Sequence, residues 1–188
     1  MEIVMIGYAG LAEGLRMIRE NKDQLRKRYA EGYLREMLED EEILRQMKEQ
    51  VDGLLETSDV RLRNPGDQAG EEEERGLEEG MLVELTDGLY AALWNLGEMG
   101  KCGLTVELSA IPLRQGTVEV CNELDVNPYE IPSPGSFLYL SSNGYRKALE
   151  FKEAGIPAFL IGTTTAEKAR VITRGEEKRY MDKIRPEK

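Results

Sequence analysis

The chain has 188 residues, of which 40% are apolar and 32% charged, the balance of a globular protein of ordinary domain size. Its net charge of −11 argues against nucleic acid and anionic membranes as partners, because both attract clustered Lys and Arg. Histidine is absent, which excludes Ser-His-Asp and Cys-His catalysis and His-ligated metals. No stretch approaches the ~20 apolar residues of a membrane helix, and no basic lead precedes the first apolar run, so we expect a cytoplasmic protein.

The two cysteines, Cys102 and Cys121, are far apart in the sequence and form no Cys-x-x-Cys motif. This spacing argues against a disulfide framework and against a zinc site. Cys121 lies in an apolar helix pattern, which favours a buried small side chain over a reactive thiol.

The first third of the chain predicts a strand followed by helices. Residues 2–8 form an apolar run, and glycines then lead into a helix whose inner face carries Leu11, Leu15 and Ile18. Residues 23–57 are charged and helical in pattern. They favour a solvated amphipathic hairpin lying on a sheet over a partner-binding coiled coil.

Residues 64–80 predict an acidic loop. Asn64-Pro65-Gly66-Asp67 is a turn signal, and Glu71–Glu74 is a run of four acids. A solvated loop is the simpler interpretation. A cation site is the alternative, although consecutive carboxylates lack the alternating ligand spacing of an EF-hand.

The remaining sequence alternates strands with helices. The expected strands are 81–85, 104–108, 137–140 and 156–161; the expected helices are 89–99, 117–124 and 145–154; and a hairpin around Gly175 joins 170–174 to 177–181. This order predicts one sheet with helices packed against it and no internal repeat.

Two glycine-containing loops are candidate phosphate sites. Gly10 and Gly14 precede a helix, whose N-terminus favours an anion. Ser133, Gly135 and Ser136 precede a strand and offer two hydroxyls and backbone amides. Tight turns that need glycine for positive φ are the alternative for both loops.

Two charged residues are further candidates. Asp87, between Thr86 and Gly88, could hold magnesium or a substrate amine, although a helix N-cap formed with Thr86 is favoured. Arg114 could bind phosphate through both guanidinium nitrogens, although a surface or inter-loop salt bridge is favoured. The residues themselves indicate neither a catalytic group nor a metal site.

A series of motifs resembles one known family. In order they are IPLRQ at 111–115, TVEVC at 117–121, DVNPY at 125–129, SPGS at 133–136 and AGIPA at 154–158, with the opening strand and turn at 3–14. Their succession resembles the C-terminal domain of the AIR synthase (PurM) superfamily. That superfamily includes HypE, selenophosphate synthetase and thiamine-monophosphate kinase (ThiL), and the HypE-like AIR-synthase-related proteins are most similar.

The resemblance implies an α+β fold, a three-layer α/β/α domain with a mixed sheet, over residues 1–188. It implies ATP-dependent chemistry of the ligase or cyclase type, or of hydrogenase maturation. In the family, a separate N-terminal domain carries the aspartates that hold Mg²⁺ and ATP. We expect that domain to be absent here, so that the chain binds no cofactor alone and takes ATP and Mg²⁺ only with a partner domain. The partner would be a separately encoded N-terminal domain or a second copy in a homodimer.

The sequence departs from the family at two places. Family members carry His-Asp-x-Thr-x-Gly-Gly before the helix that corresponds to 89–99, whereas this chain has Thr86-Asp87-Gly88 without the histidine. HypE proteins end in a reacting cysteine, which this sequence lacks. We therefore expect the chain to be inactive alone. A non-catalytic interaction or regulatory protein that kept the fold is the alternative.

Overall fold

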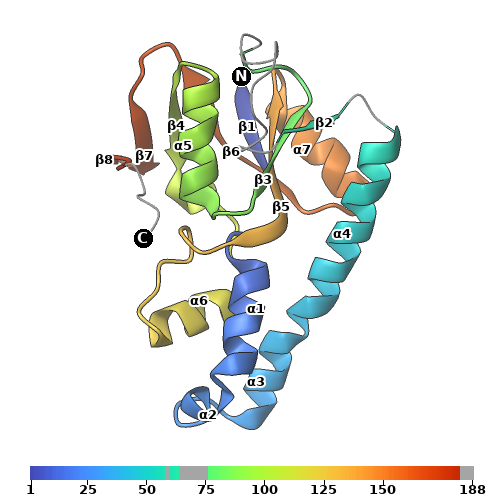
Figure 1. The fold of residues 1–188 in the computed structure, drawn as a ribbon, viewed down its shortest axis with the longest axis vertical. Coiled ribbons are helices and arrows are strands. Elements are labelled where there is room, and N and C mark those ends of the chain that lie inside the picture. Colours follow the sequence, from blue (N-terminus) through green and yellow to red (C-terminus); the bar gives the residue numbers. More distant parts are fainter. Residues whose placement is uncertain (58–59, 64–75, 183–188) are drawn as a thin grey trace.

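The computed structural model describes residues 1–57, 60–63 and 76–182, which form an eight-stranded mixed sheet and seven α-helices (Figure 1). The strand order is β2-β3-β5-β1-β6-β4-β7-β8, with β2/β3 and β4/β7 parallel and the other pairs antiparallel. The strands are β1 (Glu2–Ile6), β2 (Arg61–Leu62), β3 (Met81–Leu85), β4 (Gly103–Glu107), β5 (Ser133–Ser141), β6 (Ala158–Thr165), β7 (Arg170–Arg174) and β8 (Glu177–Tyr180). The helices are α1 (Leu11–Glu20), α2 (Lys22–Leu25), α3 (Glu31–Leu38), α4 (Asp40–Thr57), α5 (Leu89–Met99), α6 (Gln115–Glu123) and α7 (Gly144–Glu153), with a 3₁₀ turn η1 (Leu108–Ala110).

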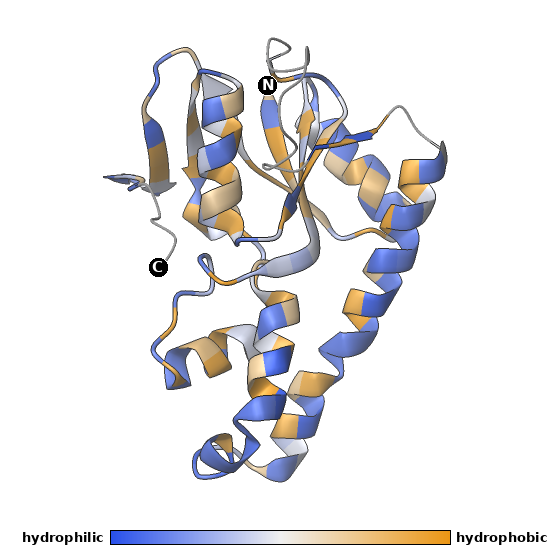
Figure 2. Cartoon of the chain, viewed as in Figure 1, coloured by the Kyte–Doolittle hydropathy of each residue, from blue (hydrophilic) through white to orange (hydrophobic). Residues whose placement is uncertain are grey.

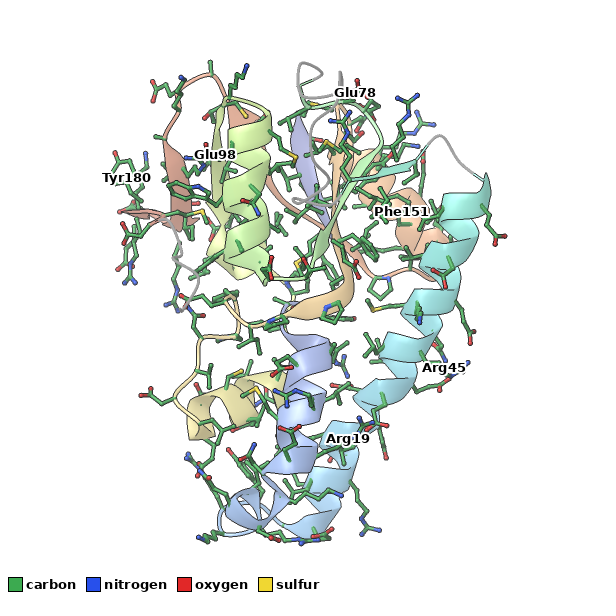
Figure 3. All side chains as sticks on the ribbon, viewed as in Figure 1. Arg19, Arg45, Glu78, Glu98, Phe151 and Tyr180 are labelled. Atoms are coloured by element: carbon green, nitrogen blue, oxygen red, sulfur yellow. The ribbon has the colours of Figure 1, made fainter. Side chains whose placement is uncertain are left out.

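Helices cover both faces of the sheet, which makes the three layers that the family resemblance implied. On one face, α5 buries Leu89, Leu93 and Leu96 against the strands. On the other face, α7 and the C-terminal half of α4 pack on the side chains of β1, β3 and β5. Phe151 of α7, which is labelled in Figure 3, meets the Tyr139 ring edge-on, with ring centroids 5.1 Å apart.

The remaining helices extend beyond one end of the sheet and have their own core (Figure 1). Met17 and Ile18 of α1 meet Leu34 of α3 and Val120 and Cys121 of α6 there. The expected hairpin therefore lies on the sheet only over the C-terminal part of α4. The difference has a physical reason, because the apolar face of α1 is buried mainly by α6, α4 and α3, and β5 is the strand that it meets.

Helix α4 has the amphipathic pattern that its sequence predicted (Figure 2). Met47 and Val51 are buried, at 1% and 2% exposure. Arg45, on the solvent side, pairs with Glu42 and Glu49 of the same helix (Figure 3). No helix among residues 1–57, 60–63 and 76–182 is both long and apolar enough to cross a membrane.

Most predicted elements agree with the structure within a few residues. Strand β3, helix α5 and the hairpin around Gly175 lie where they were expected. The two-residue strand β2 was not predicted, since a short exposed pair leaves no apolar pattern. Helix α6 begins at Gln115, two residues before the expected start at 117. The turn Asn64–Asp67 and the acids Glu71–Glu74 lie outside the described residues.

Gly14 lets α1 and α6 approach closely. A Cβ at this position would lie 2.9 Å from Thr117 Oγ1, and Thr117 is itself 2% exposed. Gly14 N donates to Gly10 O inside the helix, at 2.7 Å. Gly14 is therefore a helix-packing residue in this structure, and its amide is not free for a phosphate.

We predict opposite effects for the same substitution at two helical glycines. Gly14→Ala should lower the free energy of unfolding by about 1–2 kcal/mol, because the new methyl group overpacks the contact with Thr117. Gly53→Ala in α4, where a Cβ meets no atom within 4 Å, should raise it by about 0.5–1 kcal/mol. Urea unfolding measures both, and equal stabilisation by the two variants would contradict the close approach.

The two cysteines differ in burial, and Cys121 is the small buried side chain that the sequence favoured. It is 1% exposed, and burial raises the pKa of its thiol to about 11. Cys102 is half-buried.

We predict that Cys121 does not react with thiol reagents in the folded protein. At pH 8 a group with this pKa is only about 0.1% thiolate. In a Cys102→Ser variant, the reagent DTNB should therefore label no thiol at pH 8 and one thiol in guanidinium. Labelling of the native variant within minutes would show that Cys121 is accessible.

Candidate functional site

Strands β1, β3 and β4 end at the same end of the sheet at which β5 and β6 begin. Strands β1 and β3 are both antiparallel to β5, so the ends of β1 and β3 lie beside its first residues. The register pairs Leu85 with Ser133 and Ile6 with Phe137. Strand β6 begins opposite Ile6, and β4, antiparallel to β6, ends at this same end. The segments after β1, β3 and β4 therefore converge with the start of β5, and they carry all the candidate residues.

The turn between β1 and α1 is tied to β5 by two serine hydroxyls. Ser133 Oγ accepts the amide hydrogen of Gly10, and Ser136 Oγ donates to Tyr8 O at 3.0 Å. Both serines are 1% exposed. Gly10 has φ +66°, and a Cβ there would lie 2.9 Å from Pro128 O. The two hydroxyls thus fix the Gly10 turn against β5. This arrangement is the tight turn that was the alternative to a phosphate site.

Residues Ser133–Ser136 are the first four residues of β5 itself, which corrects the expectation of a loop before the strand. Gly135 has φ +84°, and its amide donates to Glu84 Oε1 at 2.9 Å. A side-chain carboxylate of the same chain therefore occupies the anion position at this amide. Of the three candidates here, only Gly135 is not buried.

Thr86, Asp87 and Gly88 connect β3 to α5. Gly88 is the N-cap, with φ +90°, and no side chain caps the helix, so the prediction that Asp87 and Thr86 form the cap was wrong. A Cβ on Gly88 would lie 2.6 Å from Glu130 O, so close backbone packing explains this glycine. Thr86 and Asp87 are exposed, which leaves both side chains free to face a ligand.

Arg114 forms a two-point ion pair with Asp40 at the start of α4. Its Nε and Nη2 lie 3.0 and 2.6 Å from the two carboxylate oxygens. The guanidinium also lies over the Tyr8 ring, 5.4 Å from the centroid. Hydrogen bonding to Asp40 raises the pKa of Arg114. This pair is the inter-loop salt bridge that the sequence favoured, and it joins α4 to the segment before α6.

The sequence did not predict Asp40 or Glu84, the acidic partners of Arg114 and Gly135. Asp40 is hidden in an acidic run that continues through Glu42. Glu84 left a weak signal, since it interrupts the apolar residues of the predicted strand 81–85. Tyr8, the ring below Arg114, was assigned only to the end of a strand.

The residues at this end of the sheet do not by themselves fit magnesium or enclose a nucleotide phosphate. Within residues 1–57, 60–63 and 76–182, no three Cys, Asp or Glu side chains are grouped so as to hold a metal ion. Asp87 alone is an insufficient donor set for Mg²⁺, which takes several oxygen ligands. The exposed groups at this end could contact a phosphate but do not enclose one.

We predict that Ser133 stabilises the fold more than an exposed serine does. Ser133→Ala leaves the buried Gly10 amide without an acceptor and should cost about 1–3 kcal/mol in unfolding free energy. Ser142→Ala, at an exposed position, should change it by less than about 0.5 kcal/mol. Chemical denaturation measures both variants. A neutral Ser133→Ala would mean that the hydroxyl is free for another role.

Comparison with solved structures shows the fold. The chain matches a structure of the hydrogenase maturation protein HypE with TM-score 0.63 and 15% identity, over 100% of this chain and 54% of that one. It matches Escherichia coli HypE with TM-score 0.62 and 16% identity, over 96% of this chain and 49% of that one. A third match is AaThiL complexed with AMPPCP and TMP, with TM-score 0.53 and 14% identity, over 94% of this chain and 49% of that one.

The sequence matches no family model and no curated protein. The chain spans about half the length of these three solved structures. At 14–16% identity these matches establish architecture only. The chain therefore has the PurM-like fold of HypE and ThiL, as the order of its motifs predicted.

Proposed function

We propose that this chain supplies one wall of a phosphate- or nucleotide-binding site and needs a partner domain to complete it. The observation that carries the proposal is the convergence of the candidate residues at one end of the sheet, in a fold shared with HypE and ThiL. Thr86, Asp87, Gly135 and Arg114 are the candidates that are not buried there. A solved ThiL with this fold is complexed with AMPPCP, a nucleotide analogue, and TMP.

The partner domain would supply the acidic ligands for Mg²⁺ and most of the enclosure for ATP. That domain would be either separately encoded or part of a second copy of the chain. Bound ATP would supply the activating phosphate, of the kind used in ligase, cyclase or hydrogenase-maturation chemistry. The described residues do not form a metal site of their own.

A non-catalytic interaction or regulatory protein is the second candidate function. It is favoured by the internal partners of the polar groups at the sheet end. Both serine hydroxyls bind the chain's own backbone, and the Arg114 guanidinium binds Asp40. In this alternative the same groups hold α1 and α4 against the sheet and meet no ligand.

We predict that the isolated chain binds AMPPCP weakly, with Kd near or above about 1 mM, equivalent to about −4 kcal/mol or weaker. Titration followed by ¹H–¹⁵N NMR should shift the amides of Thr86, Asp87 and Gly135. Without Mg²⁺, Asp87→Asn should tighten binding at least about twofold, because an exposed carboxylate repels phosphate. Glu167→Gln, an exposed acid between β6 and β7 at the opposite end of the sheet, is the matched control and should have no effect.

The outcomes separate the two functions. Shifts confined to the sheet end support the phosphate-facing wall, whereas no shift there at 10 mM AMPPCP supports the non-catalytic protein. Tight binding with Mg²⁺, or ATP turnover by the purified chain, would overturn the need for a partner. Sedimentation equilibrium determines whether a second copy is that partner, since a strict monomer at high concentration excludes the homodimer.

A further inference from the structure

A carboxylate occupies a core-facing position on strand β3. Because side chains alternate along a strand, Glu84 points to the same face as Leu82, which is 1% exposed in the core below α4. Glu84 is half-buried, and in the part of the chain that the structure describes its carboxylate accepts a hydrogen bond from the Gly135 amide alone. No Lys or Arg of the described ranges forms an ion pair with it. An apolar residue would bury more favourably at this position, since a partly desolvated, unpaired charge is costly.

Glu84 lines a hollow of about 350 Å³ between α4 and the start of β5. Its apolar walls include Leu44 and Val51 of α4 and Phe137 of β5. Gly135 forms part of the rim, and a Cβ there would come no closer than 3.5 Å to Leu44. A largely apolar cavity of this volume with few polar groups is typical of small-molecule sites. We call this hollow the α4 pocket.

The charges of the α4 pocket favour a cation. Glu84 and Asp52 contribute two carboxylates, and Lys48 contributes one ammonium group. Lys48 and Asp52 are both exposed and one helical turn apart on α4, whereas Glu84 is the least exposed of the three. No ion pair within 4.0 Å joins Lys48 to either acid in the described ranges. The pocket's net charge of −1 and the more buried position of Glu84 attract a positive group inward.

We propose that the α4 pocket binds a small molecule with a protonated primary amine and an apolar body. The ammonium group donates to the Glu84 carboxylate, which has capacity beyond the one amide hydrogen that it accepts. The apolar body packs against Leu44, Val51 and Phe137. A carboxylate ligand would instead be repelled by Glu84 and Asp52. The proposal concerns the surface between α4 and β5 and does not depend on nucleotide binding at the sheet end.

Three probes of equal size test the charge preference: benzylamine, which is protonated at pH 7, benzyl alcohol and benzoate. ¹H–¹⁵N NMR titration of the full chain should give saturable shifts at the amides of Val51 and Gly135. Benzylamine should bind at least about tenfold more tightly than benzyl alcohol, and benzoate should not bind. Equal affinity for the amine and the alcohol, or shifts confined to other elements, would overturn the proposal.

Glu84→Gln is the decisive variant. Its amide oxygen still accepts the Gly135 hydrogen bond, so the fold should be retained, while the charge is removed. Benzylamine should then bind no more than about twofold better than benzyl alcohol. Glu153→Gln on α7, which removes an exposed carboxylate outside the pocket, should leave the tenfold preference unchanged. A preference that survives Glu84→Gln would contradict the assigned role.

Leu44→Trp tests the location independently, since the larger ring fills the pocket. All binding of benzylamine should be lost while the thermal unfolding temperature of the variant stays close to that of the parent. If this variant fails to fold, the Glu84→Gln comparison still decides the proposal. Absence of saturable binding of benzylamine to the parent chain at 20 mM would also reject it.

Discussion

The position of β5 between β1 and β3 is the constraint on which the rest of the structure depends. Because β5 is antiparallel to both neighbours, β1 and β3 run in the same direction and end at the same place. The chain must leave each strand there and enter α1 or α5. Candidate residues that are more than 120 positions apart in sequence, such as Gly10 and Ser133, are brought into hydrogen-bond contact by this pairing. No local sequence property could have done so.

Polar side chains at this end of the sheet mainly hold the helices in place. Ser133 and Ser136 fix the start of α1, and the ion pair of Arg114 with Asp40 fixes the start of α4. Each side chain satisfies a group that would otherwise be buried without a partner, which is costly. A surface whose hydrogen-bond donors pair with groups of the same chain is rigid, but few of its donors remain for a ligand. The site is therefore better suited to completion by a partner than to binding alone.

The sequence predicted the helices and strands whose apolar residues are buried in the sheet. Its predictions were wrong where packing between distant segments determines the structure. The apolar run of β3 and the periodic face of α5 were sufficient to place both. The position of α1 beyond the end of the sheet was not predicted, because α3 and α6 bury its apolar face as well as strands would. The prediction of a helix cap at Asp87 was wrong for a related reason. The chain reaches α5 through Gly88 at φ +90°, which only the packing of Glu130 against it explains.

The sequence identified most residues of the candidate site but not the contacts that they make. Its motifs identified Ser133, Gly135 and Arg114, yet the acids that meet them, Glu84 and Asp40, are ordinary in sequence. Glu84 connects the sheet end with the α4 pocket, since its carboxylate accepts a hydrogen bond from the Gly135 amide at the sheet end and also lines the α4 pocket. A cation that binds Glu84 leaves the hydrogen bond from Gly135 in place, because a carboxylate has several acceptor sites.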